Sequence, residues 1–167
     1  SLYLTNEYGI RDIYKSYGIQ RIYYFPFDVC DGALSTYQEK EKKYDVLFTG
    51  SFLTQGNRIP WLTQINKEIP VTIFSWNWKE WESRGFTAYP AVYGETYNEL
   101  IAQSKIILGL SVNPRCWGYW SNRVGKVLRA GGTLIYEFAP GMEQLLPSCV
   151  RYFNSPQEAI EKITGPI

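Results

Sequence analysis

The chain has 167 residues, of which 45% are hydrophobic and 20% are charged, and its formal net charge is +1. These values are typical of one globular domain with a single core, and the near-neutral charge argues against the basic excess of nucleic-acid-binding proteins. The absence of histidine excludes Ser-His and Cys-His nucleophile pairs and imidazole-ligated metals. Aromatic residues make up 17% of the chain, a content that serves a packed core or the stacking of sugars and bases.

The cysteines and the hydropathy pattern indicate a cytoplasmic protein. Cys30, Cys116 and Cys149 are odd in number and far apart in the sequence, so they predict neither a disulfide framework nor a zinc site. The longest apolar runs, such as residues 106–110, are too short to cross a bilayer, and no secretory segment opens the chain. We therefore expect a reducing, cytoplasmic environment, no membrane span and no metal.

The first 43 residues predict a helix, a strand and a connector. Apolar residues recur at helical spacing over residues 6–16, and Gly18 follows them as a stop. Residues 22–25 have the composition of a short strand. Residues 31–43 are polar and carry mixed charge, which is typical of a solvated connector.

From residue 44 onward, strands and helices alternate regularly. Strands are predicted over residues 45–49, 71–75, 106–111, 133–136 and 150–153. Helices are predicted over residues 57–67, 96–104, 142–146 and 156–163, with a further helix opening at Ser121 and with Ser155 capping the last one. Continuous apolar strands such as IILGL are typical of a parallel sheet buried on both faces. The pattern thus predicts a Rossmann-like, three-layer α/β domain with a mainly parallel sheet.

Ligands of such sheets bind at the carboxyl ends of the strands, near a switch in strand order. Gly50 and Ser51 follow the first regular strand, and Trp76 and Asn77 follow the second. A glycine turn lets backbone N–H groups approach an anion, although the residues around Gly50, taken in isolation, favour a plain tight turn. Neither of the two common glycine-rich phosphate-binding fingerprints occurs.

Positive charges gather near two predicted helix starts. Ser121 and Asn122 are typical N-cap residues, and Arg123 and Lys126 follow them. The N-terminus of a helix beside cations suits a phosphate, and Arg58 at an earlier helix start can bind a phosphate or carboxylate with two donors. The alternative is an ordinary helix and strand pair with solvated cations.

Trp76 at a strand end could stack on a flat ring, with Asn77 reading the edge of that ring. Trp78 and Trp81 are spaced so that they could instead simply cover the core. Glu137 is the best placed carboxylate near a strand end, and because such carboxylates are few, a paired-carboxylate glycosidase has little support.

Taken in order, the segments VLFTGS, WNW, IILGLSVN, SNR and GGTLI, with Arg58 between the first two, resemble the C-terminal half of a GT-B glycosyltransferase. The similarity is to the spore-maturation-protein-like branch, related to the group-1 family, and it extends over residues 44–163. The resemblance implies a nucleotide-sugar-binding domain at residues 44–167. It also implies that residues 1–43 form the connection to the nucleotide-sugar-binding domain from an N-terminal domain that the sequence lacks, or that a partner subunit supplies.

The resemblance further implies a nucleotide-diphosphate sugar as co-substrate, no other cofactor, metal-independent transfer and an unknown acceptor. Donor-binding residues are expected to be Gly50, Ser51, Arg58, Trp76, Asn77, Ser121, Asn122, Arg123 and Lys126, and no catalytic residue is identified. Lys126 stands where the family usually places a glutamate on the ribose hydroxyls, and a lysine cannot accept hydrogen bonds. The alternatives are therefore a non-catalytic nucleotide- or glycan-binding module and, without support from the charge, sugar transfer to nucleic acid.

Overall fold

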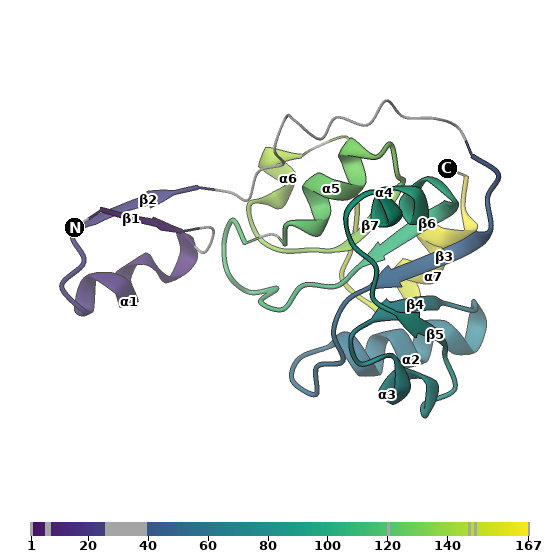
Figure 1. Cartoon of the computed structure of the whole chain (residues 1–167). Coiled ribbons are helices and arrows are strands. Elements are labelled where there is room, and N and C mark those ends of the chain that lie inside the picture. Colours follow the sequence, from purple (N-terminus) through teal and green to yellow (C-terminus); the bar gives the residue numbers. More distant parts are fainter. Residues whose placement is uncertain are drawn as a thin grey trace.

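The predicted alternation forms a six-stranded parallel sheet in the order β5-β4-β3-β6-β7-β8 (Figure 1). The computed structural model describes residues 2–5, 8–25, 40–119, 121–146, 148 and 150–166. The strands are β3 (Tyr44–Thr49), β4 (Thr72–Ser75), β5 (Thr87–Pro90), β6 (Ser104–Gly109), β7 (Leu134–Glu137) and β8 (Val150–Phe153). Every pair of neighbouring strands is parallel, which confirms the predicted fold class.

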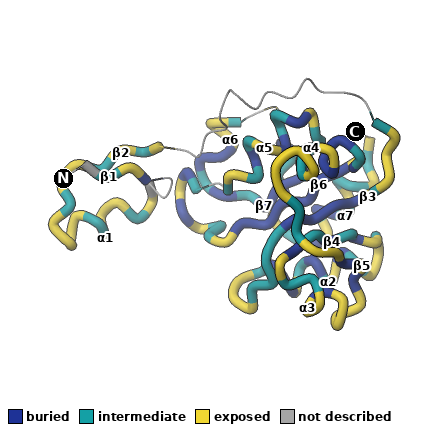
Figure 2. Tube along the Cα trace, in the orientation of Figure 1, coloured by how far each residue is buried: buried dark blue, intermediate teal, exposed yellow. Residues whose placement is uncertain are grey.

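Helices cover both faces of the sheet. They are α2 (Arg58–Glu68), α3 (Trp78–Glu82), α4 (Gly94–Ala102), α5 (Arg123–Arg129), α6 (Met142–Leu145) and α7 (Pro156–Thr164). One core cluster joins the sheet to α2, α3 and α7, and the other joins it to α4, α5 and α6. Buried residues accordingly follow the central strands in Figure 2. These two clusters are the helix–sheet interfaces on the two faces of the sheet, as the predicted three-layer arrangement requires.

The strand order reverses between β3 and β6. The chain first runs outward from β3 through β4 to β5, and α4 then returns it to β6 on the other side of β3. The two central strands pair in register, with Phe48 opposite Leu108. In open parallel sheets such a switch point separates the loops that follow the two strands and leaves room for a ligand. The carboxyl ends of the strands beside this switch point are therefore the expected place for a site.

The N-terminal segment forms a separate two-stranded parallel sheet to one side of the main sheet (Figure 1). It contains β1 (Leu2–Thr5), a 3-10 turn (Tyr8–Ile10), α1 (Arg11–Ser16) and β2 (Arg21–Tyr24). The Tyr24 hydroxyl donates to the Gly118 carbonyl at 2.6 Å, which joins this unit to the loop after β6. The predicted helix and strand are thus present, whereas β1 was not predicted.

Several expectations differ from the structure in detail. The sequence predicted neither α3 nor β5, and β5 is an edge strand with mostly exposed residues and a proline at its end. The predicted cap of the last helix is confirmed, since the Ser155 hydroxyl accepts from the Glu158 N–H at 3.2 Å. Residues 6, 7 and 31–39, Cys30 and Cys149 lie outside the described residues. Within the described part of the chain, no helix has the length and hydrophobicity needed to span a bilayer.

Glu137 ties the carboxyl rim of the sheet together. Its side chain is 2% exposed and accepts from the Asn57 amide at 3.1 Å and from the Ser111 backbone N–H at 2.9 Å. Burial raises the pKa of this carboxyl, and the two hydrogen bonds and the charge of Arg58 counteract that increase only in part. The carboxylate therefore joins the loops after β3, β6 and β7, and both of its oxygens are occupied.

The two core tryptophans provide a test of the packing. Trp81 is fully buried, whereas Trp78 is only partly buried against the same cluster. We expect Trp81→Ala to lower the free energy of unfolding by about 3–5 kcal/mol, because it leaves a large cavity, and Trp78→Ala to lower it clearly less. Urea denaturation of both variants measures this difference. Equal losses would contradict the assigned core.

Glu137 predicts a pH dependence of stability. The pKa of the Glu137 carboxyl is higher in the folded protein than in the unfolded chain, so the folded protein binds the carboxyl proton more tightly. The free energy of unfolding therefore falls as pH rises from the ordinary pKa of 4.5 through the raised pKa. We expect Glu137→Gln to flatten this fall, since glutamine stays neutral and can turn its oxygen toward Ser111. Urea midpoints measured from about pH 4 to about pH 8 test this, with exposed Glu68→Gln as the control. Parallel pH profiles for wild type and Glu137→Gln would refute it.

Candidate functional site

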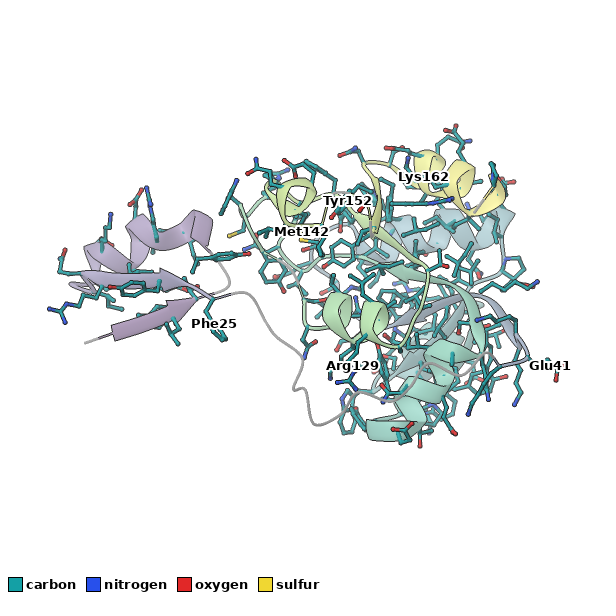
Figure 3. All side chains as sticks on the ribbon, turned by 90° about the horizontal axis from the view of Figure 1, so that it is seen from above. Phe25, Glu41, Arg129, Met142, Tyr152 and Lys162 are labelled. Atoms are coloured by element: carbon teal, nitrogen blue, oxygen red, sulfur yellow. The ribbon has the colours of Figure 1, made fainter. Side chains whose placement is uncertain are left out.

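A pocket of about 490 Å³ opens at the carboxyl ends of β3, β4 and β5. Its floor comes from these strand ends, and its walls come from α4 on one side and α5 on the other. Figure 3 shows Arg129, one of the lining residues, at the end of α5 beside α4. The volume lies in the range of small-ligand sites. Six of the predicted donor-binding residues line it, namely Gly50, Ser51, Trp76, Asn122, Arg123 and Lys126.

One end of the pocket is aromatic. Trp76 is 76% exposed, and its ring centroid lies 5.5 Å from that of Tyr93 at an interplanar angle of 46°. Phe74 and Val92 complete this end. Exposed aromatic rings beside an apolar floor are suited to stacking against a base or the apolar face of a sugar.

The other end of the pocket is built around the Arg123 guanidinium. Its Nε donates to the Thr49 hydroxyl at 3.2 Å, and its Cζ lies 5.2 Å from the centroid of the Phe48 ring. Its Nη1 is buried and has no hydrogen-bond partner. A buried charged donor without an acceptor is costly, so an anionic oxygen toward which the guanidinium turned would satisfy it.

Gly50 is required for a reason that the sequence did not reveal. A Cβ at this position would lie 2.7 Å from Arg123 Nη2 and 2.8 Å from the Phe48 ring. The Gly50 N–H itself donates to the Phe74 carbonyl at 3.2 Å, so this particular amide is already paired and does not face an anion. The missing side chain instead leaves room for the guanidinium of Arg123.

The predicted capping of α5 is wrong. The helix begins at Arg123, and Asn122 before it already has helical backbone angles and makes no side-chain cap bond; a capping residue normally has an extended backbone. The Ser121 backbone N–H donates to the Tyr136 hydroxyl at 3.4 Å, and the Ser121 side chain does not line the pocket. Asn122 does line it, as does its chain neighbour Arg123.

Two other predicted residues, Arg58 and Asn77, are not among the residues that line the pocket. Arg58 is 4% exposed and donates to the carbonyls of Ser51 and Leu110, both at 3.1 Å. Burial, and secondarily the charge of Arg123, lower its pKa to about 10, so it still carries its charge at neutral pH. The Asn77 side-chain oxygen accepts from the Phe52 N–H at 3.4 Å.

The walls of the pocket bear a positive balance of charge. Arg123, Lys126 and Arg129 line the α5 side, and among the described residues Glu95 is the one carboxylate in the lining. The ammonium of Lys126 lies 5.9 Å from the centroid of the Tyr97 ring on α4. Such a wall attracts an anion such as a phosphate.

The sequence interpretation missed the whole α4 side of the pocket. Tyr93, Glu95, Tyr97 and Asn98 all line it, and the Tyr97 hydroxyl lies 3.2 Å from that of Thr49. The sequence feature that could have revealed this wall is the YGETYN segment. In it, aromatic, acidic and amide residues gather at a helix start shortly after β5. Because β5 was not predicted, this helix start was not placed at the strand ends.

Comparisons with known proteins identify a family and a shared fold. The sequence pattern of the family described as "Glycosyl transferase-like" matches residues 58–165. An α1,3-fucosyltransferase structure matches with a TM-score of 0.56 and 21% identity over 73% of this chain and 33% of that protein. The glycosyltransferase AviGT4, involved in avilamycin A biosynthesis, matches with a TM-score of 0.59 and 16% identity over 90% of this chain and 50% of that protein.

No curated protein matches the chain in sequence. At these low identities the two structural matches establish the fold alone, and the chain spans one third to one half of the proteins that it matches. The fold corresponds to one half of a GT-B glycosyltransferase. Because the family pattern covers most of the sequence, the chain belongs to the glycosyl transferase-like family.

Proposed function

We propose that this chain is the donor-binding half of a glycosyltransferase of the spore-maturation-protein-like branch. It holds a nucleotide-diphosphate sugar in the pocket between α4 and α5, and the sugar passes to an acceptor bound by a further domain or subunit. The family match supports glycosyl transfer in general. The observation that carries the assignment to this pocket is that Arg123, whose buried Nη1 has no partner, lines the same pocket as the paired rings of Trp76 and Tyr93.

The pocket has a suitable place for each part of the donor. The base stacks against Trp76 and Tyr93, and the diphosphate lies toward Arg123 and Lys126. Lys126 has no acceptor atom for the ribose hydroxyls. The ribose therefore lies away from Lys126, against the α4 wall. There Glu95 is the available carboxylate, and its Oε2 accepts from the Asn98 amide at 3.3 Å.

The same cations serve the chemistry of transfer. When the acceptor oxygen attacks the anomeric carbon, the bond between that carbon and the diphosphate oxygen breaks, and negative charge develops on the departing nucleoside diphosphate. Fixed cations near that charge stabilise the transition state more than the ground state. Arg123 and Lys126 thereby supply charge stabilisation that a bound Mg²⁺ supplies in other phosphate sites, so we propose that transfer is metal-independent.

Nucleotide binding tests this proposal directly. We expect calorimetry with UDP, GDP, TDP and their sugars to detect one preferred diphosphate, and Arg123→Met to weaken its binding about tenfold to a hundredfold, as expected for a lost charged hydrogen bond. Arg151→Met is the matched control, because Arg151 lies on β8 at the opposite edge of the sheet. Binding of glycans without any nucleotide would favour the non-catalytic module instead. Donor hydrolysis that Arg123→Met abolishes would demonstrate turnover.

The aromatic end predicts a second, separable effect. We expect Trp76→Leu to weaken binding of the free nucleoside by about 1–3 kcal/mol, the usual range for stacking of a base on an aromatic ring. Tyr17→Leu, which removes another highly exposed aromatic ring outside the pocket, should leave the affinity unchanged. Fluorescence titration of both variants measures the difference, and an unchanged affinity in Trp76→Leu would place the base elsewhere.

A further inference from the structure

A single peptide group behind the pocket is held from both sides. The carbonyl of Ser51 accepts from Arg58 Nη1 at 3.1 Å, and the N–H of Phe52 donates to the Asn77 side chain at 3.4 Å. These two atoms belong to the same peptide bond, which is planar. Partners on both edges therefore fix the rotation of this plane, and with it the turn from Gly50 to Ser51.

Each partner is itself anchored to another strand end. Arg58 Nη2 donates to the carbonyl of Leu110, directly after β6, at 3.1 Å. The backbone N–H of Asn77 donates to the hydroxyl of Ser75 on β4 at 3.1 Å. The peptide after Ser51 is thus connected to the ends of β4 and β6 on either side of β3.

The arrangement is a costly way to hold a loop. A guanidinium that is 4% exposed and bonded to neutral carbonyls has lost much of its hydration, and its Nε has no partner. Its Cζ also lies 5.5 Å from the same Phe48 ring that Arg123 contacts from 5.2 Å. Apolar residues of similar size usually stabilise a core at least as well as buried charges, so a role beyond stability is indicated.

We propose that Arg58 and Asn77 are positioning residues, which set the Gly50–Ser51 turn against the phosphate end of the pocket without touching the ligand. This inference rests on the proposed function, because it is the diphosphate that the turn faces. It also gives Arg58 and Asn77, which were predicted to bind the donor directly, an indirect role. Neither lines the pocket. We call the hydrogen bonds of Arg58 and Asn77 to the peptide after Ser51 the clamp. Both Nη atoms of Arg58 already donate to carbonyls, so direct contact with a phosphate would require breaking the clamp.

Three variants test the clamp on the full chain. Arg58→Met removes the charge and both donors, Arg58→Lys keeps the charge but cannot bond both carbonyls in one plane, and Asn77→Leu removes the acceptor without any change of charge. Each is titrated with the preferred nucleoside diphosphate and with the corresponding nucleoside. We expect all three to weaken diphosphate binding, about tenfold for Arg58→Met, and to leave nucleoside binding unchanged.

Hydrogen exchange provides a readout that needs no ligand. We expect the Phe52 amide to exchange faster in Arg58→Met and Asn77→Leu, because the peptide is free to rotate. The control is the Ile107 amide, which donates to the Thr133 carbonyl inside the sheet and should keep its wild-type rate. Faster exchange at both amides would show general destabilisation and overturn a positioning role.

The outcomes separate the two proposals. If the wild-type chain binds no nucleotide, the proposed function fails, and unchanged Phe52 exchange in the variants would overturn the clamp as well. If wild type binds but Arg58→Lys restores full diphosphate affinity, the charge of Arg58 and not its geometry is responsible, and the clamp is refuted. Equal loss of nucleoside and diphosphate affinity also refutes it.

Discussion

The site depends on one buried ring and the two arginines beside it. Phe48, near the end of the central strand β3, is fully buried, and the guanidinium carbons of Arg58 and Arg123 both lie within 5.5 Å of its centroid. The charge of Arg123 contributes to lowering the pKa of Arg58, so the two charges repel each other, and the two side chains have different surroundings. Arg58 donates to two carbonyls, whereas Arg123 lines the pocket and its buried Nη1 has no partner. An anion bound at Arg123 would offset that repulsion.

The topology explains why these groups meet. Arg58 opens the helix after β3, and Arg123 opens the helix that follows β6. Because β3 and β6 pair at the point where the strand order reverses, the two helix starts come together although they are far apart in the sequence. The crossing helix α4, which joins β5 to β6, then closes the opposite side of the pocket with Tyr93, Glu95 and Tyr97. The ligand position follows from the connection of the strands.

The sheet and much of the pocket were predictable from the sequence, because runs such as VLFTG and IILGL indicate buried parallel strands and their ends mark the rim. The α4 wall was not, since Thr87–Pro90 is a mostly exposed edge strand that ends in a proline and lacks the apolar signal of the central strands. The true place of Arg58 and Asn77 was also hidden. Sequence puts both near strand ends, but only the structure shows that their side chains turn toward the backbone behind the pocket.

A crystal structure of the chain with its preferred nucleoside diphosphate is the most direct measurement. We predict that a diphosphate oxygen lies within hydrogen-bond distance of the Arg123 guanidinium, that the base lies on Trp76, and that Arg58 keeps both of its carbonyl partners. A nucleotide bound on another face of the sheet, or one bound in this pocket with Arg123 turned away from the phosphates, would contradict the role assigned to the arginine pair.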